Sequence, residues 1–177
     1  MIRRLAGLVS RDVLLSVYHA CFASRASYGI VLWGNSTHAV DIFRLQKRVV
    51  RLLARRAWGE SCRGAFSELN ILTVPSMFVL AALKLVKEKE PHLPCPSDSH
   101  GYNTRNKDCV RPPFTRLATT LRCDPIQVGA RLWNAIPREI RSLPAGIFSR
   151  VIKKNLIRAE LYEVNDLFSV QWMMQTV

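Results

Sequence analysis

A chain of 177 residues with 49% hydrophobic residues has too much apolar content to be intrinsically disordered. Its 26 Lys and Arg residues outnumber its 13 Asp and Glu residues, giving a net charge of +13. This excess favours a polyanionic partner, either nucleic acid or an acidic membrane surface. No apolar run approaches the roughly 20 residues that a membrane-spanning helix needs. Five cysteines at irregular spacing indicate free thiols in a reducing compartment, which predicts the nucleus or the cytoplasm.

The N-terminal part predicts two helical segments. Ser10 is a suitable N-cap for a helix that begins at Arg11, where apolar residues start to recur at helical spacing. A second apolar segment runs from Ser24 to Leu32 and contains Gly29, which favours a close crossing with another helix. Gly34 ends it, because glycine is a common helix C-cap.

The segment Asp41–Trp58 is expected to be a helix, capped by Ser36 or Thr37, on which the first two segments pack. Five basic side chains fall within roughly 100° of one another on a helical wheel, and we call them the basic ridge: Arg44, Lys47, Arg48, Arg51 and Arg55. The opposite side carries apolar residues, namely Ile42, Leu45, Val49, Leu52 and Leu53.

The basic ridge holds no carboxylate, and its like-charge pairs at i,i+4 each destabilise the helix by about 0.2–0.5 kcal/mol. A face that only needs solvating would interleave acidic residues and avoid this cost. The pattern therefore favours a ridge that follows the phosphates of a nucleic acid, with a plain solvated face as the alternative.

A short helical turn near Ala65 and a longer helix, Met77–Lys89, complete the first half of the chain. The inward residues expected on the longer helix are Phe78, Ala81, Ala82 and Leu85. Pro91 ends it. Residues 91–123 are rich in Pro, Ser, Asn and Asp, which predicts an extended linker, with a short strand or hairpin arm at Phe114–Leu121.

The C-terminal part predicts a small helical subdomain over residues 124–163 and an unassigned tail over residues 164–177. Asp124 and Pro125 form a helix start, and Pro144 begins a last helix, Ala145–Tyr162. The apolar face of this last helix is Phe148, Val151, Ile152 and Leu156. Its polar face forms a second, weaker basic face: Arg150, Lys153, Lys154 and Arg158.

The sequence carries no recognisable catalytic pattern. Its six aspartates are isolated from one another, whereas a two-metal polymerase or nuclease site needs clustered carboxylates. It has no glycine-rich phosphate loop or dinucleotide fingerprint. A zinc site drawn from His92, Cys95, His100 and Cys109 would have spacings that match no common zinc motif. We expect no metal, no cofactor and no catalysis by this chain alone.

Four stretches within residues 5–157 carry a recognisable pattern in a fixed order: Tyr28-Gly29-x-x-x-Trp33-Gly34, then Leu45-Gln46-Lys47-Arg48, then His100-Gly101-Tyr102-Asn103-Thr104-Arg105, then Gly129-x-x-Leu132-Trp133-Asn134-x-Ile136-Pro137-x-x-Ile140-Arg141. Together they resemble the C-terminal part of non-LTR (LINE-type) retrotransposon reverse transcriptases, which are RNA-directed DNA polymerases. In that family this part follows the catalytic palm, and it forms a helical thumb that grips the template–primer duplex, followed by a further C-terminal segment.

The resemblance implies that the basic ridge faces an RNA or DNA backbone as part of a thumb. The family's fingers, its palm with a Tyr-x-Asp-Asp type motif and its endonuclease have no counterpart in the sequence. The chain is therefore expected to be a truncated C-terminal fragment of such an element, without the polymerase active site. A missing palm or another protein is an expected partner, and a membrane is not.

The expected fold class is mainly α, with a helical thumb-like bundle over residues 1–90, a Pro-rich linker over residues 91–123 and the small helical subdomain. Two alternatives to nucleic-acid binding stay open. One is a non-catalytic helical adaptor for another protein, anchored by Tyr28, Trp33 and the Met/Trp tail. The other is a degenerate element copy with no selected function.

Overall fold

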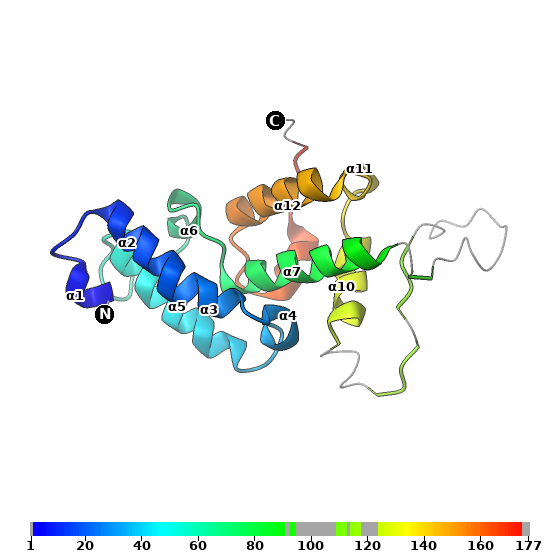
Figure 1. Cartoon of the computed structure of the whole chain (residues 1–177), viewed down its shortest axis with the longest axis horizontal. Helices are drawn as coiled ribbons and strands as arrows, with labels where there is room; N and C mark the ends of the chain where they lie inside the picture. The colour runs from blue at the N-terminus through cyan, green and yellow to red at the C-terminus, as the bar shows by residue number, and fades with distance from the viewer. Residues whose placement is uncertain (1, 91–92, 95–108, 113, 118–123, 175–177) are drawn as a thin grey trace.

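The computed structural model describes residues 2–90, 93–94, 109–112, 114–117 and 124–174. Within these ranges the chain forms helices and turns without a strand, so the mainly α prediction is confirmed (Figure 1). The helices, in chain order, are α1 (Ile2–Leu5), α2 (Arg11–Tyr18), the π-helix η1 (His19–Ala23), α3 (Ser24–Ser27), α4 (Ile30–Trp33), α5 (Ala39–Leu53), α6 (Ala65–Glu68), α7 (Val74–Lys89), α10 (Pro125–Asn134), α11 (Arg138–Arg141), α12 (Ala145–Ala159) and the 3₁₀-helix η3 (Val164–Ser169).

Helix α7 lies at the centre of the fold (Figure 1). It begins at Val74, three residues before the predicted Met77, because Pro75 fits the first turn and the hydroxyl oxygen of Thr73 accepts a hydrogen bond from the Ser76 N–H at 3.1 Å. Its neighbours include α4, α5, α10 and α12, which come from both halves of the chain. Of the residues expected to point inward, Phe78 and Ala82 are buried and the other two are half-buried.

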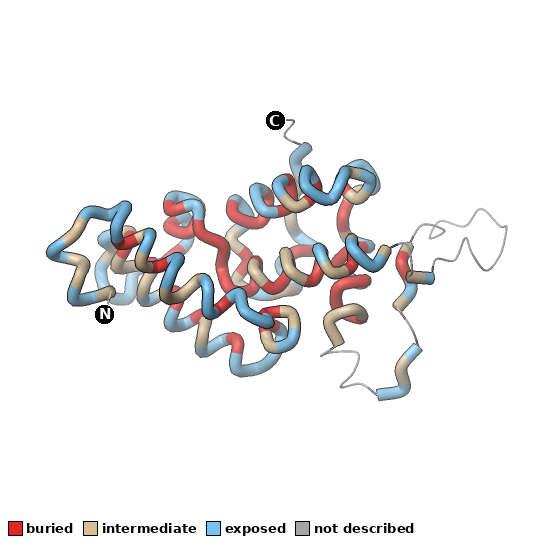
Figure 2. Tube along the Cα trace, in the orientation of Figure 1, coloured by how far each residue is buried: buried red, intermediate tan, exposed pale blue. Residues whose placement is uncertain are grey.

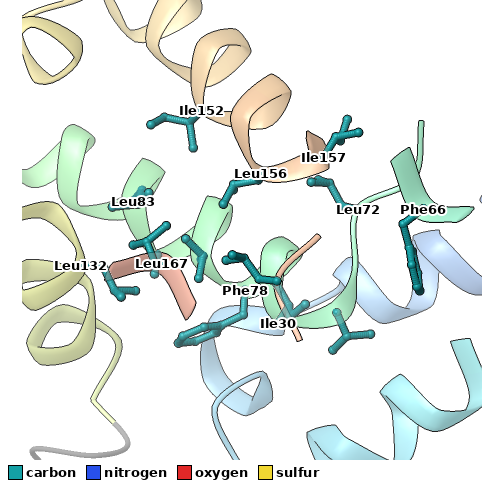
Figure 3. Packing of buried hydrophobic residues seen from close by; sticks show 14 of the residues in the cluster. Ile30, Phe66, Leu72, Phe78, Leu83, Leu132, Ile152, Leu156, Ile157 and Leu167 are labelled. Carbon is teal, nitrogen blue, oxygen red and sulfur yellow. The ribbon is translucent and has the colours of Figure 1, made fainter. Parts of the chain in front are cut away.

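One hydrophobic core joins the two parts of the chain that the sequence divides near residue 91. Figure 2 shows that buried backbone follows α7 and the segments facing it on both sides. The close-up of Figure 3 shows Phe78 and Leu83 of α7 in the same cluster as Ile30 of α4, Leu132 of α10 and Leu156 of α12. The predicted subdomain limits stay a prediction, but both predicted subdomains contribute side chains to the same core.

The close helix crossing expected at Gly29 occurs instead at two other glycines, Gly34 and Gly129. Gly29 has a left-handed φ of 57° and a Cβ there would meet nothing within 4 Å, so this residue breaks the predicted helix between α3 and α4. The close approach lies instead at Gly34, where a Cβ would be 2.8 Å from Cδ2 of Phe78. Gly129 similarly lets α10 cross α7, since its Cβ would be 2.7 Å from Cγ2 of Val86.

The helix ends agree with the sequence where proline and aspartate provide the signal. Asp124 caps α10, with its Oδ1 accepting from the Ile126 N–H at 2.9 Å. Ser10 precedes α2 as predicted, but its side chain makes no capping hydrogen bond. The N-cap of α5 is His38, so neither Ser36 nor Thr37 occupies that position.

Helix α12 is shorter than predicted, and the tail that follows it is ordered by its own cap. The helix ends at Ala159 because Glu160 takes a left-handed φ of 45°. Glu163 and Asp166 then form a reciprocal capping box at the start of η3. Leu167 of η3 is completely buried, so the segment that the sequence left unassigned returns to the core.

Several predictions fall on residues outside the described ranges. They are the His100–Arg105 motif, most of the linker, and three of the four zinc candidates, His92, Cys95 and His100. Of the expected strand at Phe114–Leu121, residues 114–117 are described and contain no strand, and residues 118–121 lie outside.

Candidate nucleic-acid interface

The buried face of α5 is rotated from the one that the helical wheel predicts. Its buried residues are Ala39, Phe43, Gln46, Val50 and Leu53. Of the predicted apolar face only Leu53 is buried, and Leu45 is 51% exposed. The prediction was correct only in part: Ile42 and Val49 pack against the core, but it left out the buried residues Phe43, Gln46 and Val50.

Gln46 explains why the core accepts this orientation of α5. Its side chain is completely buried, and its Nε2 donates to the Tyr18 hydroxyl and to the Leu72 carbonyl oxygen, each at 2.8 Å. Its Oε1 accepts from the Val74 N–H at 2.9 Å. The amide is therefore fully engaged, which removes most of the cost of burying it. It ties α5 to α2 and to the start of α7.

The structure divides the basic ridge into exposed and half-buried members. Arg44 and Arg48 are exposed, one turn apart on the outer side of α5, while Lys47 and Arg51 are half-buried. Arg55 is exposed but lies beyond the helix, which ends at Leu53, and its φ of 54° is left-handed. Expecting Arg55 on the same helix was wrong. The ridge is therefore two exposed helical arginines, with a third in the loop that follows.

Arg44 has an acidic neighbour that the wheel overlooked. Its Nη1 lies 2.9 Å from Oδ1 of Asp41, three residues earlier, and both side chains are 65% exposed. An exposed pair of this kind stabilises by only about 0–1 kcal/mol and is screened by salt. Among the described residues, the other four members of the ridge form no ion pair.

The two half-buried members of the ridge make contacts inside the protein. The Lys47 ammonium lies 4.8 Å from the ring centre of Phe43 and 5.6 Å from that of Tyr162. The Arg51 Nε donates to the Glu60 carbonyl oxygen at 2.7 Å. These side chains keep their charge near the surface but are partly used for packing.

The loop that connects α5 to α6 adds cations that the sequence analysis did not assign. The Arg63 guanidinium lies 5.0 Å from the ring centre of Tyr162, and Arg56 donates from Nη1 to the carbonyl oxygens of Ser61 and Arg63 at 2.7 and 2.8 Å. Cys62 is buried among them, and burial raises the pKa of its thiol although the charges of nearby basic residues lower it. In the sequence, the adjacent residues Arg55 and Arg56 were the signal that this loop carries positive charge.

Two further arginines, Arg3 and Arg4, are exposed on α1. Helix α1 packs against α2 and α5, at the end of the molecule where α5 finishes (Figure 1). Their adjacency to the basic helix could not be read from the sequence, because it depends on how α1 folds back.

The second basic face is where the sequence predicts it, on exposed positions of α12. Arg158 is exposed as well but is engaged within the protein, because its Nη2 donates to the Gln171 carbonyl oxygen at 2.7 Å and its Nη1 contacts the Met173 sulfur. Helix α12 and helix α5 lie on different sides of α7 (Figure 1). Arg63, in the loop after α5, and Arg158 of α12 nevertheless line the same surface pocket.

Within the described ranges, no three His, Cys, Asp or Glu side chains gather as metal ligands. None of the described helices combines the length and apolar character that crossing a bilayer requires. Comparisons of the chain with protein-family models, curated proteins and solved structures found no match. The likeness to non-LTR reverse transcriptases therefore depends on the four sequence stretches alone.

Proposed function

We propose that this chain binds the phosphate backbone of RNA or DNA without sequence preference, as the thumb-like part of a reverse transcriptase of the non-LTR retrotransposon type. One observation carries the proposal. Helix α5 is anchored through Phe43, Gln46 and Val50, and it holds Arg44 and Arg48 in solvent on its outer side. A rigid backing keeps the cations in place when a polyanion approaches.

The electrostatic free energy of this surface is lower in contact with a polyanion than in contact with water alone. Arg44 and Arg48 are a like-charge pair at i,i+4, which costs the free helix a few tenths of a kcal/mol. A phosphate backbone removes that repulsion and releases its own condensed counterions, so binding gains free energy from both effects. The net charge of +13 acts in the same direction over a longer range.

The resemblance to the polymerase family supports the thumb assignment through residues that hold the fold. Gln46 of the Leu45–Arg48 stretch links three helices through its amide. Gly129 and Trp133 of the last stretch lie on α10, where the glycine allows close packing on α7 and Trp133 is buried. In this proposal the chemistry of DNA synthesis belongs to a palm, whose carboxylate motif the present sequence does not contain.

A salt titration of nucleic-acid binding tests the proposal. Fluorescence anisotropy with a labelled RNA–DNA hybrid gives the slope of log K against log salt, which we expect near −4 if about five phosphates are engaged. The variant R44Q/R48Q/R55Q removes the exposed members of the ridge. It should flatten the slope by about 2 to 3, since each lost phosphate contact contributes about 0.7–0.9.

The matched control is R150Q/K153Q/K154Q on α12, which removes the same number of charges on another side of α7. It should leave the slope close to that of the parent chain. Equal losses in both variants would mean that only net charge matters, and an unchanged slope in the α5 variant would overturn the assignment of the ridge.

A protein-interaction role is the second candidate, because one apolar surface is unusually exposed. Tyr28 is 85% exposed and Leu32, in the neighbouring helix α4, is 79% exposed. Large exposed aromatic and aliphatic side chains are typical of contact surfaces. Sedimentation over a range of protein concentrations separates the two functions: self-association that Tyr28→Ser and Leu32→Ser abolish, together with weak nucleic-acid binding, would favour the adaptor.

A further inference from the structure

Trp58 stands out among the four tryptophans of the chain. Its side chain is 81% exposed, whereas Trp133 is buried and Trp33 and Trp172 are half-buried. It lies in the loop that leaves the basic helix α5, close after Arg55. A single exposed aromatic residue is not unusual. Trp58 is distinguished by the structure of the loop that carries it and by the positive charges next to it.

The loop around Trp58 is built by side chains that hold its backbone in place. Arg51 donates to the Glu60 carbonyl oxygen at 2.7 Å, and the Glu60 carboxylate accepts from the Ala57 N–H at 3.1 Å. Arg56 donates to two carbonyl oxygens further along the loop, and Cys62 is buried beneath it. The exposed indole is therefore presented by a braced loop.

Positively charged side chains lie near the indole of Trp58. The Arg48 guanidinium carbon lies 5.7 Å from the centre of the Trp58 ring, and Arg55 is exposed in the same loop. Aromatic side chains set among Lys and Arg are the platform on which proteins bind single-stranded nucleic acid, because the cations follow the backbone while the ring stacks on a base. Bases inside a duplex are already stacked on their neighbours and offer no free face.

We propose that Trp58 stacks on an unpaired nucleobase of the strand whose backbone the basic ridge binds. This inference rests on the proposed function and adds a substrate preference to it. A duplex that continues into a single-stranded extension should bind more tightly than the same duplex with blunt ends. Arg48 belongs to both the backbone site and the stacking site, because it is a member of the basic ridge and lies over the indole ring.

The test compares two labelled RNA–DNA hybrids of identical duplex length, one blunt and one with an eight-nucleotide single-stranded extension. The variant W58A should weaken binding to the extended hybrid about tenfold and leave binding to the blunt hybrid unchanged. The variant W58F should recover most of the affinity, since a phenyl ring still stacks. The variant W172A controls for the loss of a tryptophan elsewhere in the chain.

The possible outcomes separate this inference from the proposed function. Equal weakening on both hybrids in W58A would overturn the stacking role and assign Trp58 a general effect. No change in W58A or W58F, with binding still reduced in R44Q/R48Q/R55Q, would overturn the stacking role and leave the backbone site standing. No effect in any variant would overturn both. Far-ultraviolet circular dichroism verifies that each variant is folded.

Discussion

Helices α5 and α7 have nearly the same length, 15 and 16 residues, but opposite roles in the fold. Helix α5 buries one side and leaves charged residues on the other, whereas α7 buries half of its residues and is contacted by helices from both ends of the chain. The sharper amphipathic pattern therefore marks a helix at the surface, and the centre of the fold has the weaker pattern. A helix surrounded by others is apolar on most sides and shows little periodicity.

This difference separates stability from binding. Side chains of α7 hold the two ends of the chain together, so their loss should be felt in the free energy of unfolding. The outer side chains of α5 contact little else in the protein, so their loss should be felt in nucleic-acid affinity. The substitutions below test that separation through the free energy of unfolding.

The largest expected effect is that of Phe78→Ala in α7. The ring is 1% exposed within the shared core, so its removal should lower the free energy of unfolding by about 3–5 kcal/mol. Urea titration followed by circular dichroism measures the change. Leu45→Ala on the outer side of α5 is the control and should change stability by less than about 0.5 kcal/mol. Equal effects would contradict the contrast between the two helices.

The next effect is that of Gln46→Leu, which tests the buried side of α5. Leucine fits the volume but removes the acceptor of the Val74 N–H and the donor to the Leu72 carbonyl oxygen. Since a buried polar group without a partner costs about 1–3 kcal/mol, stability should fall by about 2–3 kcal/mol. Urea titration again measures the loss. A neutral or stabilising result would show that the amide network is dispensable.

The positions of several helices were predictable because their signals are local. A proline after Asp124 and one at position 75 begin helices wherever the chain is otherwise helical, since proline fits the first turn and lacks the N–H that the helix leaves free. The alternation of apolar and basic residues on α12 predicted its faces correctly, because each of the apolar residues named for it is buried.

The orientation of α5 was not predictable in the same way. The prediction used only the apolar and basic positions of the helical wheel and left Gln46 unassigned, whereas hydrogen bonds to Tyr18 and Leu72 satisfy its amide inside the core. The exposed arginines of the candidate site were predictable, since Arg44 and Arg48 lie outward on either orientation. The roles of Arg51 and Arg56 as braces of a loop depend on carbonyl oxygens that only folding brings near.

A smaller effect, which appears only at alkaline pH, is expected from Tyr18 beneath α5. Burial raises the pKa of Tyr18 from 10.0 to about 12, although the hydrogen bond from Gln46 lowers it. The neutral form is thus favoured in the folded state. Its contribution to stability is complete below pH 10 and is lost as the pH rises toward 12, by at most about 1.4 kcal/mol per pH unit.

Urea titrations at pH 9 and pH 11 measure this loss. Tyr18→Phe should lower the stability at both values through the missing hydroxyl, but it should make the difference between them smaller. Burial also raises the pKa of Cys62 and of Tyr162, so some alkaline loss should remain in that variant. An unaltered difference in Tyr18→Phe would mean that the hydroxyl ionises as readily in the folded chain as in the unfolded one.

The smallest effect on stability is expected from R44Q/R48Q/R55Q, the variant that should bind nucleic acid most weakly. Its three side chains are exposed. The variant loses the solvent-exposed Arg44–Asp41 ion pair and the contact of Arg48 with the Trp58 ring, while the repulsion between Arg44 and Arg48 also disappears. These changes oppose each other, so the free energy of unfolding should stay within about 0.5 kcal/mol of the parent chain. Thermal and urea unfolding at low salt, where surface charges act most strongly, give the most sensitive measurement. A loss comparable to that of Gln46→Leu would show that the arginines hold the fold, and weak binding by this variant would then no longer identify a nucleic-acid site.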